Sequence, residues 1–286
     1  MSRIAYVNGR YVPHREAAVH IEDRGYQFAD GIYEVCEVYG GLLVDETRHL
    51  ARMKRSLDEL RIAMPMTLPA LKVVLRETIR RNRVHDGMVY LQVTRGVARR
   101  DHVFPSADTP PAIVVTAKSI DRKKGNAAAE NGISVITTPD NRWDRVDIKS
   151  VGLLPNCMAR QAAKEVGAKE AWFVDRDGFV TEGAATNAWI ITKDGKLVTR
   201  PAEFGILRGV TRTTLFDLAA KEKLTIEERP FTVAEAKAAR EAFISAATTL
   251  IMPVVKIDDT VIGNGKPGSM ALRLRAEFHS HAEMAA

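Results

Sequence analysis

The sequence predicts an α+β fold in two domains. Strand-like and helix-like stretches are grouped along the chain, without the regular strand and helix alternation of a doubly wound sheet. Glycine fingerprints of the Walker and Rossmann types are absent from the sequence. The chain of 286 residues exceeds the usual size of one domain, and a charged stretch without apolar periodicity follows residue 118.

The first 118 residues are expected to form a smaller, N-terminal α/β domain. Extended runs joined by hairpin turns at Asn8-Gly9 and Gly40-Gly41 predict an antiparallel sheet. Apolar residues spaced three or four apart predict a helix over about 47–62 and a second helix after Pro69. The runs MVYLQVTRG and AIVVTA predict two more strands.

Residues 119–132 are expected to be an interdomain linker, and 133–286 a larger C-terminal domain. This domain begins with the predicted strand ISVITTP, a second strand in DRVDIKSVGLL and a helix starting near Asn156. Hairpins are predicted around Asp177-Gly178 and Asp194-Gly195. Helices over about 211–223 and 233–240 and the apolar segment 241–258 complete the domain.

The composition excludes several classes of protein. A content of 45% hydrophobic and 27% charged residues indicates a folded globular chain. No apolar run exceeds four residues, which excludes a membrane-spanning helix. The N-terminus lacks the apolar region of a signal peptide, so we expect a cytoplasmic protein. Two cysteines are too few for a disulfide scaffold or a cysteine-based zinc site, and no metal is expected.

A net charge of +6 raises the question of nucleic-acid binding. The basic stretches are short and separate, and no known nucleic-acid-binding motif surrounds them. The excess of positive charge therefore favours a site for small anions. A basic, non-enzymatic binding protein remains as an alternative.

Lys149 is the first candidate for chemistry. It stands among apolar residues in VDIKSVGLL, which predicts a largely buried strand. Burial would lower the pKa of the lysine and make its amine nucleophilic enough for a Schiff base. The alternative is an edge-strand lysine whose ammonium group reaches water.

Glu182 is the second candidate. It ends a predicted hairpin strand and is followed by Gly183 and small residues, which would let a flat ligand approach the backbone. A carboxylate in this position could pair with a protonated ring nitrogen. A solvated glutamate at a strand end is the alternative.

A third feature predicts an anion site. In ILRGVTRTTLFDL, a turn containing Gly209 opens a helix at Val210 and Thr211, which leaves unpaired N–H groups at its positive end. Arg52 beside the apolar stripe of the first long helix and Thr248 in SAATT could add donors. Each signal taken alone is weak, because any helix start resembles an anion site.

Five ordered segments identify a family. EDRGYQFADGIYEV, QVTRGVARRDHVFP, DIKSVGLL, VTEGAATN and ILRGVTR follow the order and spacing of the class IV pyridoxal-phosphate enzymes. Within this group the chain resembles the D-amino acid aminotransferases along nearly its whole length. The resemblance implies their two-domain fold, pyridoxal 5′-phosphate as cofactor, a cofactor-binding C-terminal domain and a homodimer.

The resemblance also implies roles for particular residues. Lys149 would bind the cofactor covalently, and Glu182 would hold its pyridine nitrogen. Four residues would take the phosphate: Arg52, Val210, Thr211 and Thr248. The substrate carboxylate would contact Tyr33, together with Arg100 and His102 from the partner chain. Substrates would be D-alanine and D-glutamate, with pyruvate and 2-oxoglutarate as the 2-oxo acids.

Two departures from the family pattern concern small residues. Ala184 and Ala185 stand where serines are common, and Ala246 and Ala247 stand where a hydroxyl-rich TST is common. These changes affect cofactor tuning and side-chain preference rather than the chemistry. Two alternatives within the fold are a branched-chain L-amino acid aminotransferase and an aminodeoxychorismate lyase, but Tyr33 with the Arg100-Asp101-His102 segment favours the D-enzyme.

Overall fold

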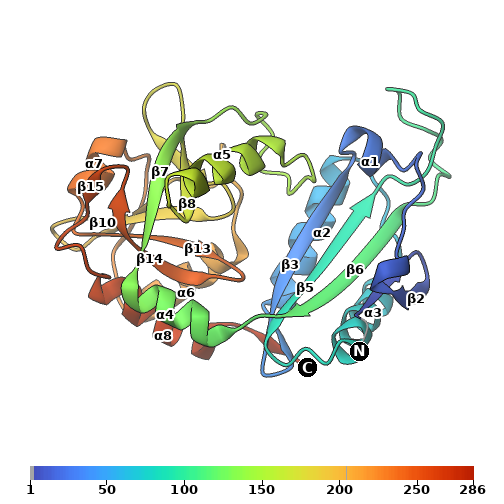
Figure 1. Ribbon diagram of the computed structural model, residues 1–286, viewed down its shortest axis with the longest axis horizontal. Helices are drawn as coiled ribbons and strands as arrows, with labels where there is room; N and C mark the ends of the chain where they lie inside the picture. The colour runs from blue at the N-terminus through green and yellow to red at the C-terminus, as the bar shows by residue number, and fades with distance from the viewer. Residues whose placement is uncertain (1–2, 204) are drawn as a thin grey trace. The chain divides into compact units, whose positions relative to one another are not determined.

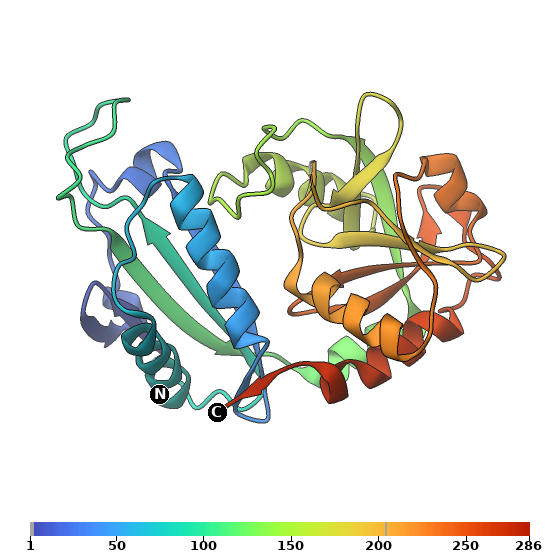
Figure 2. The ribbon, with the colours of Figure 1, turned by 180° about the vertical axis from the view of Figure 1, so that it is seen from behind.

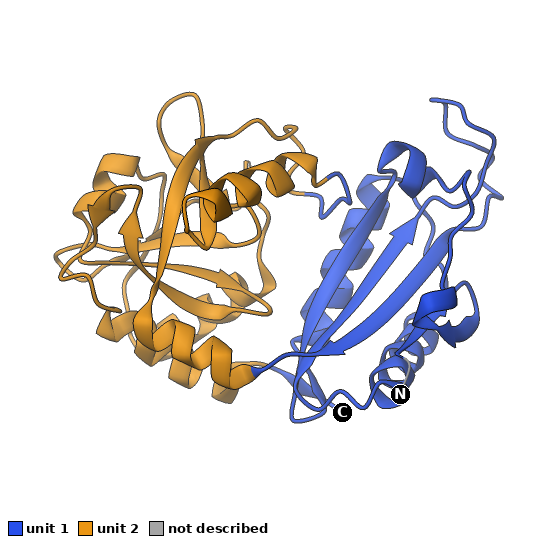
Figure 3. Ribbon diagram, in the orientation of Figure 1, with its two compact units in different colours: residues 1–121, 148–152, 283–286 blue, residues 122–147, 153–282 orange. Residues whose placement is uncertain are grey.

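The computed structural model describes residues 3–203 and 205–286, which form two compact units. Unit 1 contains the chain up to Asp121 together with Ile148–Gly152 and Glu283–Ala286 (Figure 3). Unit 2 contains Arg122–Asp147 and Leu153–Ala282. The predicted α+β class is confirmed, because both units combine a sheet with separate helices.

A seven-stranded antiparallel sheet is the centre of unit 1 (Figure 1). The hairpins predicted at Asn8-Gly9 and Gly40-Gly41 are both present. A 3₁₀ turn, η1 (His14–Glu16), and a short helix, α1 (Arg24–Phe28), follow the first hairpin. In spatial order the strands are β16 (Met284–Ala285), β4 (Leu42–Val44), β3 (Gly31–Tyr39), β5 (Gly87–Thr94), β6 (Ala112–Ser119), β1 (Ile4–Val7) and β2 (Arg10–Pro13).

Two long helices cover one face of this sheet, as Figure 2 shows: α2 (Glu46–Glu59) and α3 (Leu68–Arg81). Side chains alternate between the two faces of a strand, so every second residue of β3 and β5 points toward the helices. The buried residues Cys36 and Leu91 belong to the same apolar core as Leu50 and Met53 of α2. The opposite face, which carries Tyr33 and Tyr90, is called the open face below.

Unit 2 has a mixed sheet of nine described strands (Figure 1). Their order is β12 (Ile226–Glu228), β11 (Leu197–Thr199), β10 (Asn187–Ile191), β13 (Glu241–Ala246), β14 (Leu250–Ile257), β7 (Ile133–Pro139), β8 (Glu170–Val174) and β9 (Val180–Gly183), and β15 (Thr260–Val261) pairs with β14. The predicted hairpins β8–β9 and β10–β11 are confirmed. The parallel pairing of β7 with β8 and β14 was not predicted.

Five helices accompany this sheet among the described residues of unit 2. They are α4 (Arg122–Asn131), α5 (Leu154–Glu165), α6 (Val210–Lys221), α7 (Val233–Ala238) and α8 (Ser269–His281). Helix α5 links the parallel strands β7 and β8, and parallel strands require such a crossover. In the described part of the chain, no helix has the length and apolar character needed to span a bilayer.

The segment 119–132, expected to be an interdomain linker, contains helix α4. Its apolar positions are alanines, so the sequence shows no strong apolar period, although alanine is the best helix former. Ala129 is buried and joins the core that contains Ile133 and Val135. The structured segment therefore belongs to unit 2 from Arg122 onward.

The expected buried strand around Lys149 is also corrected. Only one isolated bridge forms there, between Ser150 and Ile32 of β3. Tyr33 donates its backbone N–H to the Lys149 carbonyl over 3.0 Å, and Val151 donates to Gly31 over 3.0 Å. The Ser150 N–H points away from β3 in this bridge and donates to the carbonyl of Ile148, two residues earlier in its own chain. Leu154, expected to be buried, is 71% exposed.

The two units differ from the predicted division at two segments. The backbone hydrogen bonds to β3 place Ile148–Gly152, and therefore Lys149, in unit 1. The end of the chain also returns to unit 1, where Met284 pairs with Val44. Both departures arise from strand pairing between residues far apart in sequence, which local patterns do not reveal.

Candidate functional site

The predicted site residues are distributed over both units. Unit 1 contains Tyr33, Arg52, Arg100, His102 and Lys149. Unit 2 contains Glu182, Val210, Thr211 and Thr248.

Lys149 and Tyr33 lie together on unit 1. The Lys149 Nζ atom is 4.1 Å from the centroid of the Tyr33 ring, within the range of a cation–π contact. Lys149 is half-buried, whereas a largely buried strand was expected from the sequence. Tyr33 also stacks on Tyr90, with ring centroids 5.8 Å apart. The amine is therefore positioned by aromatic side chains of the open face.

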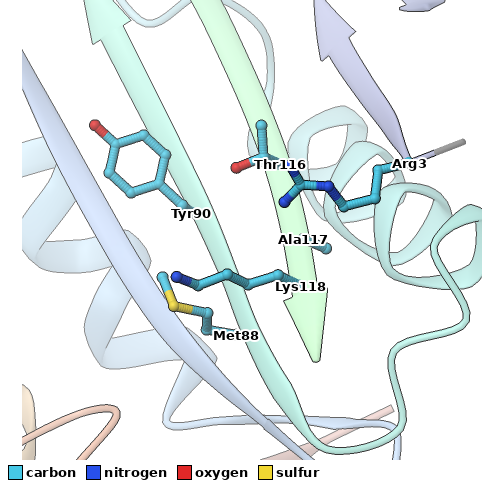
Figure 4. A pocket seen from close by; sticks show the side chains of 6 residues that line it. All are labelled: Arg3, Met88, Tyr90, Thr116, Ala117 and Lys118. Carbon is cyan, nitrogen blue, oxygen red and sulfur yellow. The ribbon is translucent and has the colours of Figure 1, made fainter. Parts of the chain in front are cut away.

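A cavity of about 150 Å³ lies on the open face (Figure 4). Its lining residues are Arg3, Met88, Tyr90, Thr116, Ala117 and Lys118. The Tyr90 hydroxyl donates to Gln92 Oε1 over 2.6 Å, and burial raises the pKa of Tyr90 to about 12. None of the predicted site residues lines the cavity, but Tyr90 connects it with Tyr33 through their stacked rings.

Arg52 of α2 makes a buried ion pair with Glu34 of β3. Its Nε and Nη2 atoms donate to the two carboxylate oxygens of Glu34 over 2.7 and 2.8 Å. His49 Nδ1 lies 2.8 Å from Glu34 Oε2 and is the donor, since an ionised carboxylate only accepts. Burial opposes ionisation of Glu34, but the charge and hydrogen bonds of Arg52 outweigh it and hold the pKa of Glu34 below its ordinary value. Glu34 is therefore an ionised carboxylate.

Arg100 and His102 gather around Phe28, the last residue of α1. The Arg100 guanidinium carbon is 4.9 Å from the Phe28 ring centroid, and the His102 ring centroid is 5.5 Å from it. Both side chains are exposed and belong to a segment without regular secondary structure. Their ring contacts in the described chain are thus with Phe28, and the structure of the single chain does not bring them to Tyr33.

A buried ionic network anchors the segment that carries Arg100 and His102. Arg24 and Arg95 both donate to the Asp30 carboxylate, at 2.7 to 2.9 Å. Arg24 Nη1 also donates to the backbone carbonyl of Asp101 over 2.6 Å. Burial opposes ionisation of Asp30, but the hydrogen bonds from both arginines keep its pKa below its ordinary value. The network fixes the backbone between the two predicted substrate-binding residues.

Glu182, on β9 in unit 2, is buried and accepts hydrogen bonds on both carboxylate oxygens. Arg142 Nη1 donates to Oε1 over 2.6 Å, and Asn187 Nδ2 donates to Oε2 over 3.1 Å. The backbone N–H of Leu207 donates to both oxygens, at 3.1 and 3.2 Å. The glutamate is 5% exposed, which rules out the solvated strand-end alternative. Hydrogen bonds donated to both oxygens favour the ionised form of this carboxylate.

Arg142 is itself fixed by Asp140. Its Nε and Nη2 atoms donate to the Asp140 carboxylate over 2.9 and 2.7 Å, and the Thr181 hydroxyl donates to the same carboxylate over 2.8 Å. Burial opposes the charge of Arg142, but hydrogen bonds to Asp140 and the charge of Glu182 raise the pKa of its guanidinium. The positive charge beside Glu182 is therefore permanent.

Helix α6 begins at Val210, as predicted, with Gly209 as its N-cap. No side chain of the described residues caps this end, and the first helical hydrogen bond runs from Thr213 to the Gly209 carbonyl. The N–H groups of Val210 and Thr211 consequently have no partner within the helix. A Cβ added at Gly209 would lie 2.0 Å from Asn187 Oδ1. The glycine permits the helix start to approach the Asn187 side chain that holds Glu182.

Thr248 lies in the turn between β13 and β14 and is exposed. Asn187, at the start of β10, pairs with Ser245 near the end of β13, so this turn and the start of α6 lie at the same end of these two strands. The hydroxyl of the next residue, Thr249, is buried and has no partner among the described residues. This end of the strands therefore combines the backbone N–H groups at the start of α6 with the Thr249 hydroxyl, a donor set that suits an anion.

The small residues after Glu182 form a tight turn. Gly183 donates its backbone N–H to the carbonyl of Thr186 over 2.7 Å. The Thr186 hydroxyl is directed to Glu170 Oε2, 3.4 Å away, and therefore does not replace the hydroxyl missing at Ala184 and Ala185. Both alanines leave the hydrogen bonds of Glu182 intact.

Sequence reasoning missed four residues that set the geometry: Glu34, His49, Arg142 and Asn187. Arg142 is close in sequence to Lys149, but the pattern NRWDR carries no periodicity that indicates an inward side chain. A detectable signal existed for Glu34, because a charged residue at a helix-facing position of a strand requires a partner.

Comparisons with known proteins identify the family of the chain. A family model described as amino-transferase class IV matches residues 31–257. The chain is 40% identical to a D-alanine aminotransferase of Staphylococcus haemolyticus over 97% of both chains. It is 42% identical to a D-alanine aminotransferase of Bacillus licheniformis, over 96% of this chain and 95% of that protein.

Solved structures share the fold. The branched-chain amino acid aminotransferase of Escherichia coli superposes with a TM-score of 0.90 at 22% identity, covering 98% of this chain and 94% of that one. A hypothetical aminotransferase from Mycobacterium tuberculosis in its PLP-bound form gives 0.84 at 21% identity, covering 97% and 98%. Since the family model spans most of the chain and both curated relatives match nearly full length, the chain belongs to the class IV aminotransferases.

Proposed function

We propose that this protein is a pyridoxal-phosphate-dependent transaminase that transfers the amino group of a D-amino acid to a 2-oxo acid. The substrate class rests on the D-alanine aminotransferases at 40% and 42% identity. D-Alanine and D-glutamate are the proposed donors, with pyruvate and 2-oxoglutarate as acceptors. The observation that carries the chemistry is the ionised Glu182, held by Arg142 over 2.6 Å.

The residues present fit this cofactor. A pyridine ring nitrogen stays protonated only beside a negative partner, and Glu182 is a buried carboxylate held ionised by its donors. When bound, pyridoxal phosphate supplies an electron-withdrawing ring that stabilises negative charge developing on the substrate α-carbon. The role of Glu182 is to keep a fixed negative charge at the ring nitrogen.

Lys149 is proposed as the covalent attachment residue and as the acid and base. Once the substrate amine has displaced Nζ from the cofactor, the neutral Nζ would take the proton from the substrate Cα and pass it to the cofactor carbon C4′; in the second half-reaction it would move a proton in the reverse direction. The Tyr33 ring, 4.1 Å from Nζ, restricts the directions that the amine can take. Orientation of this kind accounts for a large part of the rate gained by bringing reacting groups together.

Four residues are proposed to bind the phosphate. The N–H groups of Val210 and Thr211 at the uncapped start of α6 offer backbone donors and the positive end of the helix dipole. Thr248 adds a hydroxyl from the turn after β13, at the same end of the strands. Arg52 adds a permanently charged guanidinium, which donates two hydrogen bonds to Glu34.

The substrate carboxylate is proposed to contact Tyr33 of one chain and Arg100 and His102 of a second chain in a homodimer. What supports the dimer is the surface beside these residues. The segments around α1 and after β5 are bridged through Asp23 and Val97. They expose large apolar side chains: Ile21 (76%), Tyr26 (76%), Val97 (41%), Val103 (72%) and Phe104 (44%). Apolar patches of this kind mark protein interfaces.

The branched-chain L-aminotransferase is the second candidate, because solved branched-chain enzymes superpose closely on this chain. Their identity is only 22% and 23%, so they establish the fold and not the substrate. An aminodeoxychorismate lyase of the same fold is less favoured, because the relatives of 40% and 42% identity are D-alanine aminotransferases. The expected cytoplasmic location stays a prediction.

Reductive trapping tests the proposed chemistry. Borohydride treatment of the yellow holoenzyme, followed by peptide mass mapping, should place the cofactor adduct on Lys149. Lys149→Ala should abolish transamination, whereas Lys164→Ala, in the exposed last turn of α5, should retain it. An adduct on another lysine, or an active Lys149→Ala variant, would overturn the assignment.

A further inference from the structure

Glu34 occupies a position in the fold that the proposed roles do not explain. It is fully buried on β3 and faces α2, while its neighbour Tyr33 points to the open face. Burying an isolated carboxylate is costly, so this position is maintained only because charged partners surround it. Those partners are Arg52 and His49, one helical turn apart on the same side of α2.

We propose that Glu34 is a positioning residue, which together with His49 fixes the Arg52 guanidinium for phosphate binding. The inference rests on the proposed function, because it assumes that Arg52 binds the cofactor phosphate. Glu34 does not itself contact the phosphate. It acts through the two parallel hydrogen bonds that set the plane of the guanidinium.

The geometry of the pair supports an orienting role. An arginine side chain loses conformational entropy when it is fixed in one position. This loss weakens ligand binding unless the side chain is already ordered in the free protein. The Arg52 side chain is only 11% exposed, and two of its donors are already held by Glu34. The guanidinium is thereby ordered before the phosphate arrives.

His49 completes the arrangement by occupying Glu34 Oε2 alongside Arg52 Nη2. Its Nδ1 is 2.8 Å from this oxygen, and the His49 side chain is 3% exposed. The carboxylate therefore cannot rotate away from Arg52 without losing both contacts. A buried carboxylate with one fewer donor would leave the plane of Arg52 less well defined.

The test compares two cofactor forms on the same apo-enzyme. Pyridoxal 5′-phosphate carries the phosphate and pyridoxal lacks it, so the ratio of their affinities isolates phosphate recognition. Glu34→Gln should weaken pyridoxal-phosphate binding roughly 2- to 12-fold, the range expected when one side chain must be ordered on binding, and should leave pyridoxal binding unchanged. Glu34→Asp keeps the negative charge, but the side chain is one methylene shorter and its carboxylate lies farther from Arg52. This variant should therefore also lower the ratio of the two affinities.

A matched control is Glu46→Gln. Glu46 is a second buried carboxylate, on the same helix as Arg52, and its partners are Arg76 and Lys72. Its loss should lower thermal stability without changing the ratio of the two affinities. If Glu46→Gln lowers the ratio as much as Glu34→Gln, general destabilisation explains the effect and the inference fails.

A double variant separates this inference from the proposed function. If Glu34 acts through Arg52, Glu34→Gln should have no further effect on the ratio in an Arg52→Ala background. An unchanged ratio in Arg52→Ala alone would refute the phosphate role of Arg52, and the inference with it. A lowered ratio in Arg52→Ala but not in Glu34→Gln or Glu34→Asp would overturn the inference alone.

Discussion

Arg142 Nη1 donates to Glu182 Oε1 over 2.6 Å, and the same guanidinium donates two further hydrogen bonds to Asp140. One arginine therefore joins two carboxylates that are far apart in sequence. All three side chains are at most 15% exposed. Both carboxylates depend on Arg142, because it makes an ion pair with each of them.

Arg142→Met should destabilise the protein strongly. It leaves Glu182 and Asp140 as buried carboxylates without their cation, and breaking a buried pair in this way costs about 3 to 5 kcal/mol. Chemical denaturation measures the loss. The control is Arg145→Met, which removes an arginine that is 48% exposed and paired with Asp147, and should cost about 1 kcal/mol or less. Equal losses in the two variants would contradict a special role for Arg142.

Gly209→Ala should disturb the link between the start of α6 and Glu182. The new Cβ would lie 2.0 Å from Asn187 Oδ1, so Asn187 must move and weaken its hydrogen bond to Glu182. We expect a loss of about 1 to 3 kcal/mol in the free energy of unfolding, together with weaker cofactor retention. Gly125→Ala, in helix α4, meets only a side-chain nitrogen at 3.8 Å and should be neutral or slightly stabilising. Similar losses at both glycines would argue against this steric account.

Stability should fall as the pH drops below about 6.5 because of His49. Burial lowers the pKa of His49 despite its contact with Glu34, and Arg52 and Asp45 are the other charged groups that act on it. A histidine with a depressed folded pKa contributes fully above its unfolded pKa of about 6.5, and the contribution is lost as pH falls toward the folded value. Urea denaturation at several pH values measures the slope.

His49→Asn should flatten this part of the profile, whereas His85→Asn, at a histidine whose side chain is 78% exposed, should preserve it. Below about pH 4 a second decline should remain in both variants, since the carboxylates of Asp30 and Asp140 have folded pKa values below their ordinary ones. A profile for His49→Asn that matches the wild type would show that another group is responsible.

The fold was largely predictable because its signals are local. Turn dipeptides such as Asn8-Gly9 and Asp177-Gly178 fix hairpins, and the apolar spacing of Leu50, Met53 and Leu57 fixes α2. Helix α4 was missed because its apolar residues are alanines, which give no strong apolar periodicity. The return of Met284 to pair with Val44 depends on contacts between distant segments, which no local pattern encodes.

The site was predictable to a different extent. The uncapped start of α6 has a local cause, so Gly209 and Val210 stood out in the sequence. The ionised state of Glu182 depends on Arg142, forty positions away in the chain. The burial of Lys149 was overestimated. Its neighbour Ile148 is buried but Leu154 is exposed, and the segment leaves β3 after a short pairing. Partners brought together by folding decide these properties.

Mixed chains test whether Arg100 acts across a dimer. Lys149→Ala and Arg100→Ala variants should each be inactive or weak, but a mixture refolded or co-expressed together should regain part of the activity. A hybrid dimer would combine the intact Lys149 of one chain with the intact Arg100 of the other. Arg100→Ala alone should raise KM for the amino donor, since a carboxylate contact is lost in both ground and transition states. The absence of any recovery would show that Arg100 serves its own chain.

The handedness of the substrate follows from the same geometry. If the carboxylate is held on one side and Lys149 Nζ approaches from a fixed direction, only one enantiomer presents its Cα hydrogen to the amine. The other enantiomer, with the same carboxylate contacts, places its side chain where the hydrogen should be. Such misplacement forfeits most of the advantage of orientation.

The most direct test of the central claim is a single-turnover panel of D- and L-amino acids on the holoenzyme, scored by bleaching of the yellow cofactor absorption. D-Alanine and D-glutamate should bleach it rapidly, and their L-forms, with L-leucine and L-valine, should do so far more slowly or not at all. Equal or faster bleaching by L-leucine or L-valine would contradict the account and assign the chain to branched-chain transamination.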